Sequence, residues 1–265
     1  DPTIFVATSF LLMFGIMFGD VGHGLALCLA GLLMRRSAGE KVRQAALLLI
    51  YCGISSSFFG LIEGSVFGHE FGSVWLKPME EIPRLFGICI NFGIGYITLG
   101  ILLNILNALR DNNFRRALFD KAGLVSGVVY WSGIALVTKI FVLRAPLSPV
   151  YASIFVAGIL VMFFKPVVEY ALKKQHESLP MVVMESFIEI FEFLTGYLSN
   201  TVSFIRIGAF ALAHTGLFMA IFELSELLKG IGGGVLSYLV IILGNVIVIL
   251  LEGMIVSIQS VRLNY

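Results

Sequence analysis

The sequence predicts an all-α membrane protein that crosses the bilayer several times. Of its 265 residues, 58% are hydrophobic and only 13% are charged, and the mean hydropathy is +0.96. These values lie outside the range of ordinary soluble domains. The apolar residues form long runs, and about 20 of them suffice for one helix to cross a hydrocarbon core of ~30 Å. The net charge of +1 gives no reason to expect a nucleic-acid partner.

Short polar breaks divide the chain into eight predicted membrane helices. The first apolar run, 4–34, is long for one span and is interrupted by several glycines, so we predict two short helices that meet near Gly19 and Asp20. The Gly-rich stretch 230–234 is expected to be a turn between the last two segments. The remaining predicted segments are 42–67, 85–109, 114–141, 149–172, 181–228 and 235 onward. As one helix, 181–228 would be about 70 Å long, so it must tilt strongly or project from the bilayer.

Lysines and arginines are distributed unequally between alternate loops. One set of loops carries eleven and the other carries five, while Arg206 and Arg262 lie within the last two segments. The positive-inside rule therefore places the richer side in the cytoplasm, together with both termini. The chain begins without Met and stops within an apparent helix, so we expect residues 1–265 to be the transmembrane, ion-translocating domain of a longer polypeptide.

The most informative stretch is 185–219, and above all its centre, TVSFIRIGAFALAH at 201–214. It is apolar and free of proline, which predicts a helix, yet Arg206 lies deep inside it. At roughly 100° per residue, a stripe about 80° wide runs along this helix. Its members are Glu185, Glu192, Ser199, Ser203, Arg206, Phe210 and His214. Ionisable groups in an apolar helix mark ion or proton paths, and the alternative is a structural Arg paired with a carboxylate from another helix.

The last segment carries a second polar set at seven-residue spacing, so its members share one helical face. They are Asn245, Glu252 and Gln259, with Arg262 one turn beyond. If the last two segments are antiparallel, His214 and Glu252 share the outer half of the membrane.

An acidic group made of Glu185, Glu189 and Glu192 falls in the inner half of the membrane, and the two arginines lie between the two halves. Acids and histidines exchange protons with water near neutral pH, whereas a guanidinium stays protonated and relays none. This order of groups predicts an ion path in two offset halves.

Other polar residues leave alternatives open. Asp20 is either the N-cap of the second helix or a channel acid, and the buried acid Glu63 either lines the outer path or is a structural group. We expect His23 and His69 to be satisfied structural groups. The three cysteines (Cys28, Cys52 and Cys89) lack metal-ligand spacing and are interpreted as small core residues. No metal or other cofactor is expected.

Three motifs resemble the membrane stator subunit (subunit a, or subunit I) of V-type and archaeal-type rotary ATPases. The stretch 201–214 resembles the signature helix of that subunit, 251–263 resembles its last helix, and FGIMFGDVGHG at 14–24 resembles its first. The motifs occur in the family order from one end of the chain to the other. Eukaryotic members have Leu-Trp after the first arginine, where this chain has Ile207-Gly208, so a prokaryotic cell membrane is favoured.

The resemblance implies eight membrane helices, the last two long and tilted beside a rotating ring of c-type proteolipid subunits. It implies that Arg206 and Arg262 face the ion-carrying carboxylate of that ring, and that a peripheral stalk, other rotary-ATPase subunits and membrane lipids are the partners. It also implies a soluble N-terminal part and no catalytic site in this subunit. Transport of H⁺ or Na⁺ stays open, because the selecting site lies on the ring. The alternatives are a proton-coupled secondary transporter with a midplane polar site, and a structural anchor, against which the intramembrane charges argue.

Overall fold

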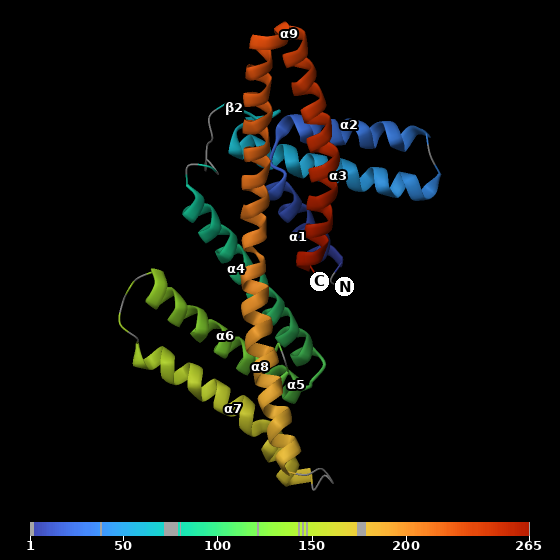
Figure 1. Ribbon diagram of the computed structural model, residues 1–265. Helices are drawn as coiled ribbons and strands as arrows, with labels where there is room; N and C mark the ends of the chain where they lie inside the picture. Colours follow the sequence, from blue (N-terminus) through green and yellow to red (C-terminus); the bar gives the residue numbers. More distant parts are fainter. Residues whose placement is uncertain are drawn as a thin grey trace. The chain divides into compact units, whose positions relative to one another are not determined.

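The computed structural model describes residues 3–37, 39–71, 79, 81–120, 122–142, 144, 146, 148–173 and 179–264. In this part of the chain the structure is helical apart from one antiparallel pair of two-residue strands (Figure 1). The all-α prediction is therefore confirmed. The chain forms two compact units, unit 1 (Asp1–Ile90 and Ser203–Tyr265) and unit 2 (Asn91–Val202).

Unit 1 is built from the two ends of the chain. Its elements are α1 (Thr3–Met17), α2 (Val21–Ser37), α3 (Glu40–Glu63), β1 (Ser65–Val66), β2 (His69–Glu70), the start of α4 (Ile82–Arg110) and α9 (Ile205–Asn264). Unit 2 takes the middle of the chain. It contains the rest of α4, then α5 (Phe114–Phe119), α6 (Leu124–Val137), the π-helical turn η1 (Thr138–Val142), α7 (Pro149–Lys173) and α8 (Leu179–Ser203) except its last residue.

Six helical stretches of the described residues are long and apolar enough to cross a membrane. They are Glu40–Glu63, Ile82–Arg110, Leu124–Val142, Pro149–Pro166, Pro180–Gly230 and Gly234–Asn264. Large apolar side chains such as Leu29, Phe141 and Leu198 point outward, 61%, 76% and 65% exposed, as lipid-facing residues do. The chain is thus a multi-pass membrane protein. Because α1 and α2 have only 15 and 17 residues, the count of eight spans stays a prediction.

The predicted break in the first apolar run is confirmed. Helix α1 ends at Met17 and α2 begins at Val21, and α3 packs tightly across the break. The Ser56 hydroxyl donates to the carbonyl oxygens of Phe18 and Asp20, at 2.5 and 3.1 Å. At Gly60 a Cβ atom would lie 2.6 Å from the carbonyl carbon of Asp20, so only glycine lets α3 approach this backbone.

Three predicted helices end or break where the sequence pattern gave no warning. The segment 42–67 stops being helical at Glu63, because Gly64 takes the left-handed conformation (φ 71°) and caps the helix. The segment 114–141 is divided between α5 and α6, where the N–H of Gly123 bonds to the carbonyl of Asp120 in a tight turn. The segment 181–228 is interrupted at Phe204, whose carbonyl accepts from Ile207, three residues on rather than four.

Helix α9 doubles back on itself (Figure 1). The first arm, 205–230, and the second arm, 234–264, are antiparallel, since Ser225 and Ser237 hydrogen-bond at 2.6 Å while His214 meets Glu252 further down. Close approach is possible at Gly244, where a Cβ atom would lie 2.8 Å from Ile221. The predicted reversal at 230–234 is confirmed, although the backbone there stays helical.

Candidate ion-translocation site

The second arm of α9 carries Asn245, Glu252 and Gln259, and each of them hydrogen-bonds to a polar side chain that is distant in the sequence. Their predicted common face is therefore confirmed. The pairs are Arg206 Nη1 with Gln259 Oε1 at 2.9 Å, His214 Nδ1 with Glu252 Oε2 at 2.5 Å, and His23 Nε2 with Asn245 Oδ1 at 2.9 Å. Two pairs join the arms of α9, and the third joins the second arm to α2.

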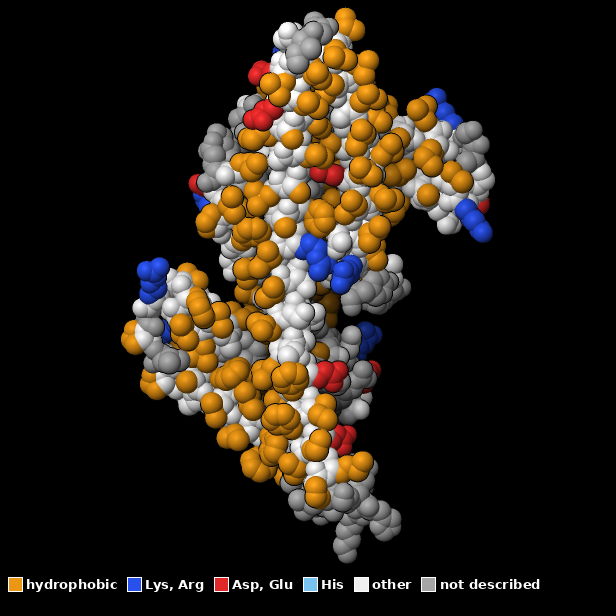
Figure 2. All heavy atoms as spheres, viewed as in Figure 1, with side chains coloured by type: hydrophobic (Ala, Val, Ile, Leu, Met, Phe, Trp, Pro, Cys, Tyr) orange, Lys and Arg blue, Asp and Glu red, His pale blue; other side chains and the backbone are white. Residues whose placement is uncertain are grey.

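Arg206 binds a neutral amide rather than an acid. Its half-buried guanidinium donates to Gln259, and no carboxylate of the described residues lies within ion-pair distance of it. Arg262, exposed on the second arm, acts electrostatically on Arg206. Figure 2 shows basic side chains at this level of the α9 hairpin, on a largely hydrophobic face. The alternative of a structural arginine paired with a carboxylate is thus not what the described residues show.

His214 lies between two acids. Its Nδ1 contacts Glu252, and a cavity of about 20 Å³ separates it from Glu63, with Ser65 and Thr215 also in the lining. This volume holds one water molecule, and the polar lining offers that water hydrogen-bond partners. The structure therefore brings His214 together with Glu252, which the sequence analysis placed in the same half of the membrane, and with Glu63, for which the outer path was one of two alternatives.

Asp20 is the N-cap of α2. Its Oδ1 accepts the N–H of His23 at 2.9 Å, three residues on, as N-cap side chains do. The same carboxylate accepts the N–H groups of Phe67 and Gly68 at 3.0 and 2.8 Å and the hydroxyl of Ser65 at 2.7 Å. Four donors thus hold this fully buried group, which fixes the strand turn to the break between α1 and α2.

His23 is not the satisfied structural group that we expected from the sequence. Its side chain is fully buried, and while Nε2 binds Asn245, Nδ1 has no hydrogen-bond partner among the described residues. Its ring packs against that of His214, with centroids 5.6 Å apart. The sequence gives one hint of a special role for His23, its position three residues after Asp20. This spacing is informative only when α2 is known to begin at Val21, between the two residues. His69, by contrast, is exposed and its ring packs on Phe222.

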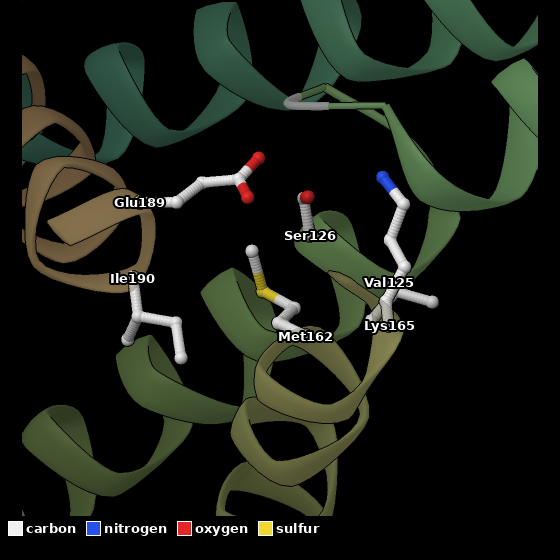
Figure 3. Close-up of a pocket in the computed structure, with 6 residues that line it drawn as sticks. All are labelled: Val125, Ser126, Met162, Lys165, Glu189 and Ile190. Atoms are coloured by element: carbon white, nitrogen blue, oxygen red, sulfur yellow. The ribbon is translucent and has the colours of Figure 1, made fainter. Parts of the chain in front are cut away.

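The predicted inner acids lie in unit 2. Glu189 and Glu192 line a cavity of about 150 Å³, together with Tyr197 and Asn200. Glu189 also extends into a second pocket, into which the ammonium of Lys165 and the hydroxyl of Ser126 point from α7 and α6 (Figure 3). Glu185 is exposed and lines neither of these two cavities, and Ser203 is half-buried in unit 1.

The fold and the site define a class, a polytopic helical membrane protein whose interior carries ionisable groups in hydrogen-bonded pairs. Side chains of this kind inside apolar helices belong to proteins that move ions or protons.

Comparison with known proteins finds similar proteins along the whole chain. No protein-family model matches the chain. Subunit I of the A-type ATP synthase of Methanocaldococcus jannaschii is 25% identical over the whole chain, which spans 42% of that protein. The corresponding subunit of Pyrococcus horikoshii is 23% identical over the whole chain and 40% of its own length. V-type ATP synthase subunit I 2 of Treponema pallidum is 32% identical over 42% of the chain. The chain is thus a relative of subunit I of A-type and V-type ATP synthases and spans about two-fifths of the archaeal subunits.

Replacing Asp20 separates its capping role from a role in transport. Asp20→Ala leaves three backbone N–H groups and the Ser65 hydroxyl without their acceptor, so we expect a loss of roughly 3 kcal/mol or more of stability. Ser65→Ala removes one hydrogen bond and should cost only about 1 kcal/mol. The measurement is thermal unfolding of the purified protein in detergent. A stable Asp20→Ala protein that assembles but fails to transport ions would instead identify Asp20 as a channel acid.

Proposed function

We propose that the chain is the membrane stator subunit of a V/A-type rotary ATPase and passes ions to and from a rotating ring of c-type subunits. The observation that carries this proposal is Arg206, a guanidinium inside an apolar helix whose hydrogen-bond partner is the neutral Gln259. Its positive charge is left for a carboxylate outside this chain. The relationship to subunit I of ATP synthases supports the same assignment.

The chemical role of this charge follows from the cost of moving a carboxylate through lipid. A ring carboxylate must lose its ion on one side and regain one on the other, and between these events it is ionised and costly to bury without a partner. A fixed guanidinium favours the ionised form, lowering the pKa of a paired carboxylate by about one to three units. Arg206 and Arg262 together also stop ions from passing directly between the two half-channels.

The outer half-channel is formed, in this proposal, by Glu63, His214 and Glu252. A neutral imidazole gives a proton from one nitrogen and takes one on the other, so His214 links Glu252 to a water in the cavity beside Glu63. Asp20 holds the backbone around this cavity and does not relay protons itself. Thr215 and Ser65 supply further polar lining.

The inner half-channel is formed by the acidic residues of α8. Glu189 and Glu192 line the cavity of about 150 Å³, and Glu185 is exposed on the same helix. Ser203, which belongs to the polar stripe of the sequence, is assigned to the same ion path. Water in this cavity delivers ions to the acids.

The partners of the chain are the c-ring, a peripheral stalk, the other subunits of the complex and membrane lipids, and a soluble N-terminal part completes the polypeptide. The complex lies in a prokaryotic cell membrane, with both ends of this domain in the cytoplasm.

The second candidate is a proton-coupled secondary transporter with a solute site near mid-depth. Sites for small molecules have volumes of about 300–1,000 Å³, and the cavities beside the polar residues, about 20 and 150 Å³, are smaller. Ions and water fit such cavities. Copurification with small, very hydrophobic ring subunits distinguishes the two candidates, because a transporter requires no ring.

The charge asymmetry of the loops makes the topology testable. In a background in which the three native cysteines are replaced by serine, single cysteines at Gly39 and Asn113 should react with a membrane-impermeant thiol reagent only from the cytoplasmic side. A cysteine at Gly230 should react only from outside. Labelling of all three probes from one side would exclude the eight-helix topology.

The outer path is tested at its two central residues. Glu252→Gln and His214→Ala each break the pair that carries the proton, so coupled transport should fall by roughly tenfold or more, with the complex still assembled. The measurement is the rate of ATP-driven pumping in reconstituted vesicles. Glu226→Gln, an exposed glutamate on the same helix, is the control and should pump normally. Unchanged rates in both test variants would make the pair a structural contact.

Arg206 is the decisive test of the stator assignment. Arg206→Ala removes the charge, and Arg206→Lys loses the planar fork and the permanence of protonation, so both should abolish ATP-driven ion transport while the complex assembles. Acidification or sodium uptake in vesicles measures this. Lys229→Ala, which removes an exposed cation from the same helix, should leave transport unchanged. Near-normal coupled transport in Arg206→Ala would rule out the stator assignment.

A further inference from the structure

Three buried side chains converge at the point where α2 meets α9. One oxygen of Asp20 and one ring nitrogen from each of His23 and His214 lie within 4.8 Å of one another. Each of the two histidines also has one buried ring nitrogen, Nδ1 of His23 and Nε2 of His214, without a hydrogen-bond partner among the described residues. Buried polar atoms almost always have a partner, and an exception points to a bound water or ion.

The outer contacts of the cluster determine which ring nitrogens carry hydrogen. The amide nitrogen of Asn245 donates to the carbonyl of Ile241 at 2.8 Å, so its Oδ1 faces His23 and accepts from Nε2. Glu252 likewise accepts from Nδ1 of His214. In the neutral rings the two inner nitrogens therefore present lone pairs. Beside these two lone pairs lies the carboxylate of Asp20, which already accepts four hydrogen bonds and adds a negative charge to the group.

We propose that Asp20, His23 and His214 form a binding site for a divalent transition-metal ion, of which Zn²⁺ is the probe used below. Two imidazoles and a carboxylate suit Zn²⁺, whereas Mg²⁺ and Ca²⁺ prefer oxygen ligands alone. Each ligand also has the outer hydrogen bond that orients ligands in metal sites. For His23 this partner is Asn245, for His214 it is Glu252, and for Asp20 it is the N–H groups and hydroxyl of the strand turn.

Binding requires a small inward movement of the side chains. Zn²⁺ bonds its nitrogen and oxygen ligands at about 2.0–2.2 Å in a tetrahedron, so neighbouring ligand atoms sit about 3.4 Å apart. His23 Nδ1 and Asp20 Oδ1 are 4.0 Å apart, and all three ligand atoms lie within 4.8 Å of one another. The pairs must therefore close by about 0.6 to 1.4 Å to reach this spacing. The cavity of about 20 Å³ beside His214 has room for a water as the fourth ligand.

A metal here inhibits transport, and this consequence rests on the proposed outer path. Coordination occupies the Nε2 lone pair of His214 and holds its ring in place, so the imidazole no longer passes protons between Glu252 and the cavity water. The site itself does not depend on that path, because its evidence is the arrangement of ligand atoms. Zinc binding and zinc inhibition are therefore separate measurements.

The binding experiment uses the purified, metal-free complex, equilibrated with micromolar Zn²⁺ in excess Mg²⁺ and then freed of unbound metal. His23→Gln replaces the imidazole with an amide whose N–H₂ group can still donate to Asn245 but which has no counterpart of Nδ1. His214→Gln likewise removes Nε2. We expect each variant to bind one Zn²⁺ fewer per complex than the parent. His69→Gln, which removes an exposed histidine, should bind as the parent does. With Co²⁺ in place of Zn²⁺, the parent should show the visible absorption of a four- or five-coordinate site, absent in His23→Gln.

Equal zinc content in the parent, His23→Gln and His214→Gln would overturn the proposal. In vesicles that pump when ATP is added to the bath, the outer path faces the lumen. Zn²⁺ enclosed in the lumen should therefore slow pumping of the parent, and loss of a ligand in His23→Gln should raise the inhibitory Zn²⁺ concentration by at least about tenfold. A bound zinc ion that leaves pumping unaffected supports the site and argues against His214 in the outer path. The two proposals therefore fail in distinguishable ways.

Discussion

The lack of water in the bilayer core is the constraint on which unit 1 depends. Polar groups there must find partners within the protein, and each unsatisfied one costs several kcal/mol. The second arm of α9 meets this requirement with Asn245, Glu252 and Gln259, which reach His23, His214 and Arg206. Sliding the arm by one residue would break all three contacts at once. The polar pairs therefore set the register of the hairpin, which apolar packing alone leaves weakly defined.

Asp20 and Arg206 are both charged groups inside apolar surroundings, and they are treated in opposite ways. Four donors surround the Asp20 carboxylate, so its charge is stabilised by neutral hydrogen-bond donors and serves the fold. Arg206 receives one neutral acceptor, Gln259, and feels the like charge of Arg262. An arrangement of this kind is unfavourable within the chain itself and becomes favourable when an external carboxylate arrives. The difference separates a structural charge from a functional one.

The periodicity of the sequence predicted those features of the fold that depend on residues close together in the chain. The seven-residue spacing of Asn245, Glu252 and Gln259 correctly placed them on one face, and the glycines around Asp20 correctly located the first break. Hydropathy did not predict the end of α3 at Glu63, because Val66 and Phe67 prolong the apolar run, whereas the left-handed backbone of Gly64 ends the helix. The half-satisfied His23 also escaped prediction, since its partner Asn245 lies 222 residues away. Contacts between distant segments leave no mark in a local pattern.

His214 is the residue at which these arguments meet. Glu252 binds one ring nitrogen, the other has no partner among the described residues, and the side chain both lines the cavity beside Glu63 and lies in the cluster with Asp20 and His23. A lone pair held in this way accepts a proton from water or coordinates a metal, but it does not do both at once. The chemistry that makes a buried imidazole a proton relay is the chemistry that makes it a metal ligand. Competition between H⁺ and a transition metal at His214 is thus a consequence of its geometry, and His23 determines how well the metal competes.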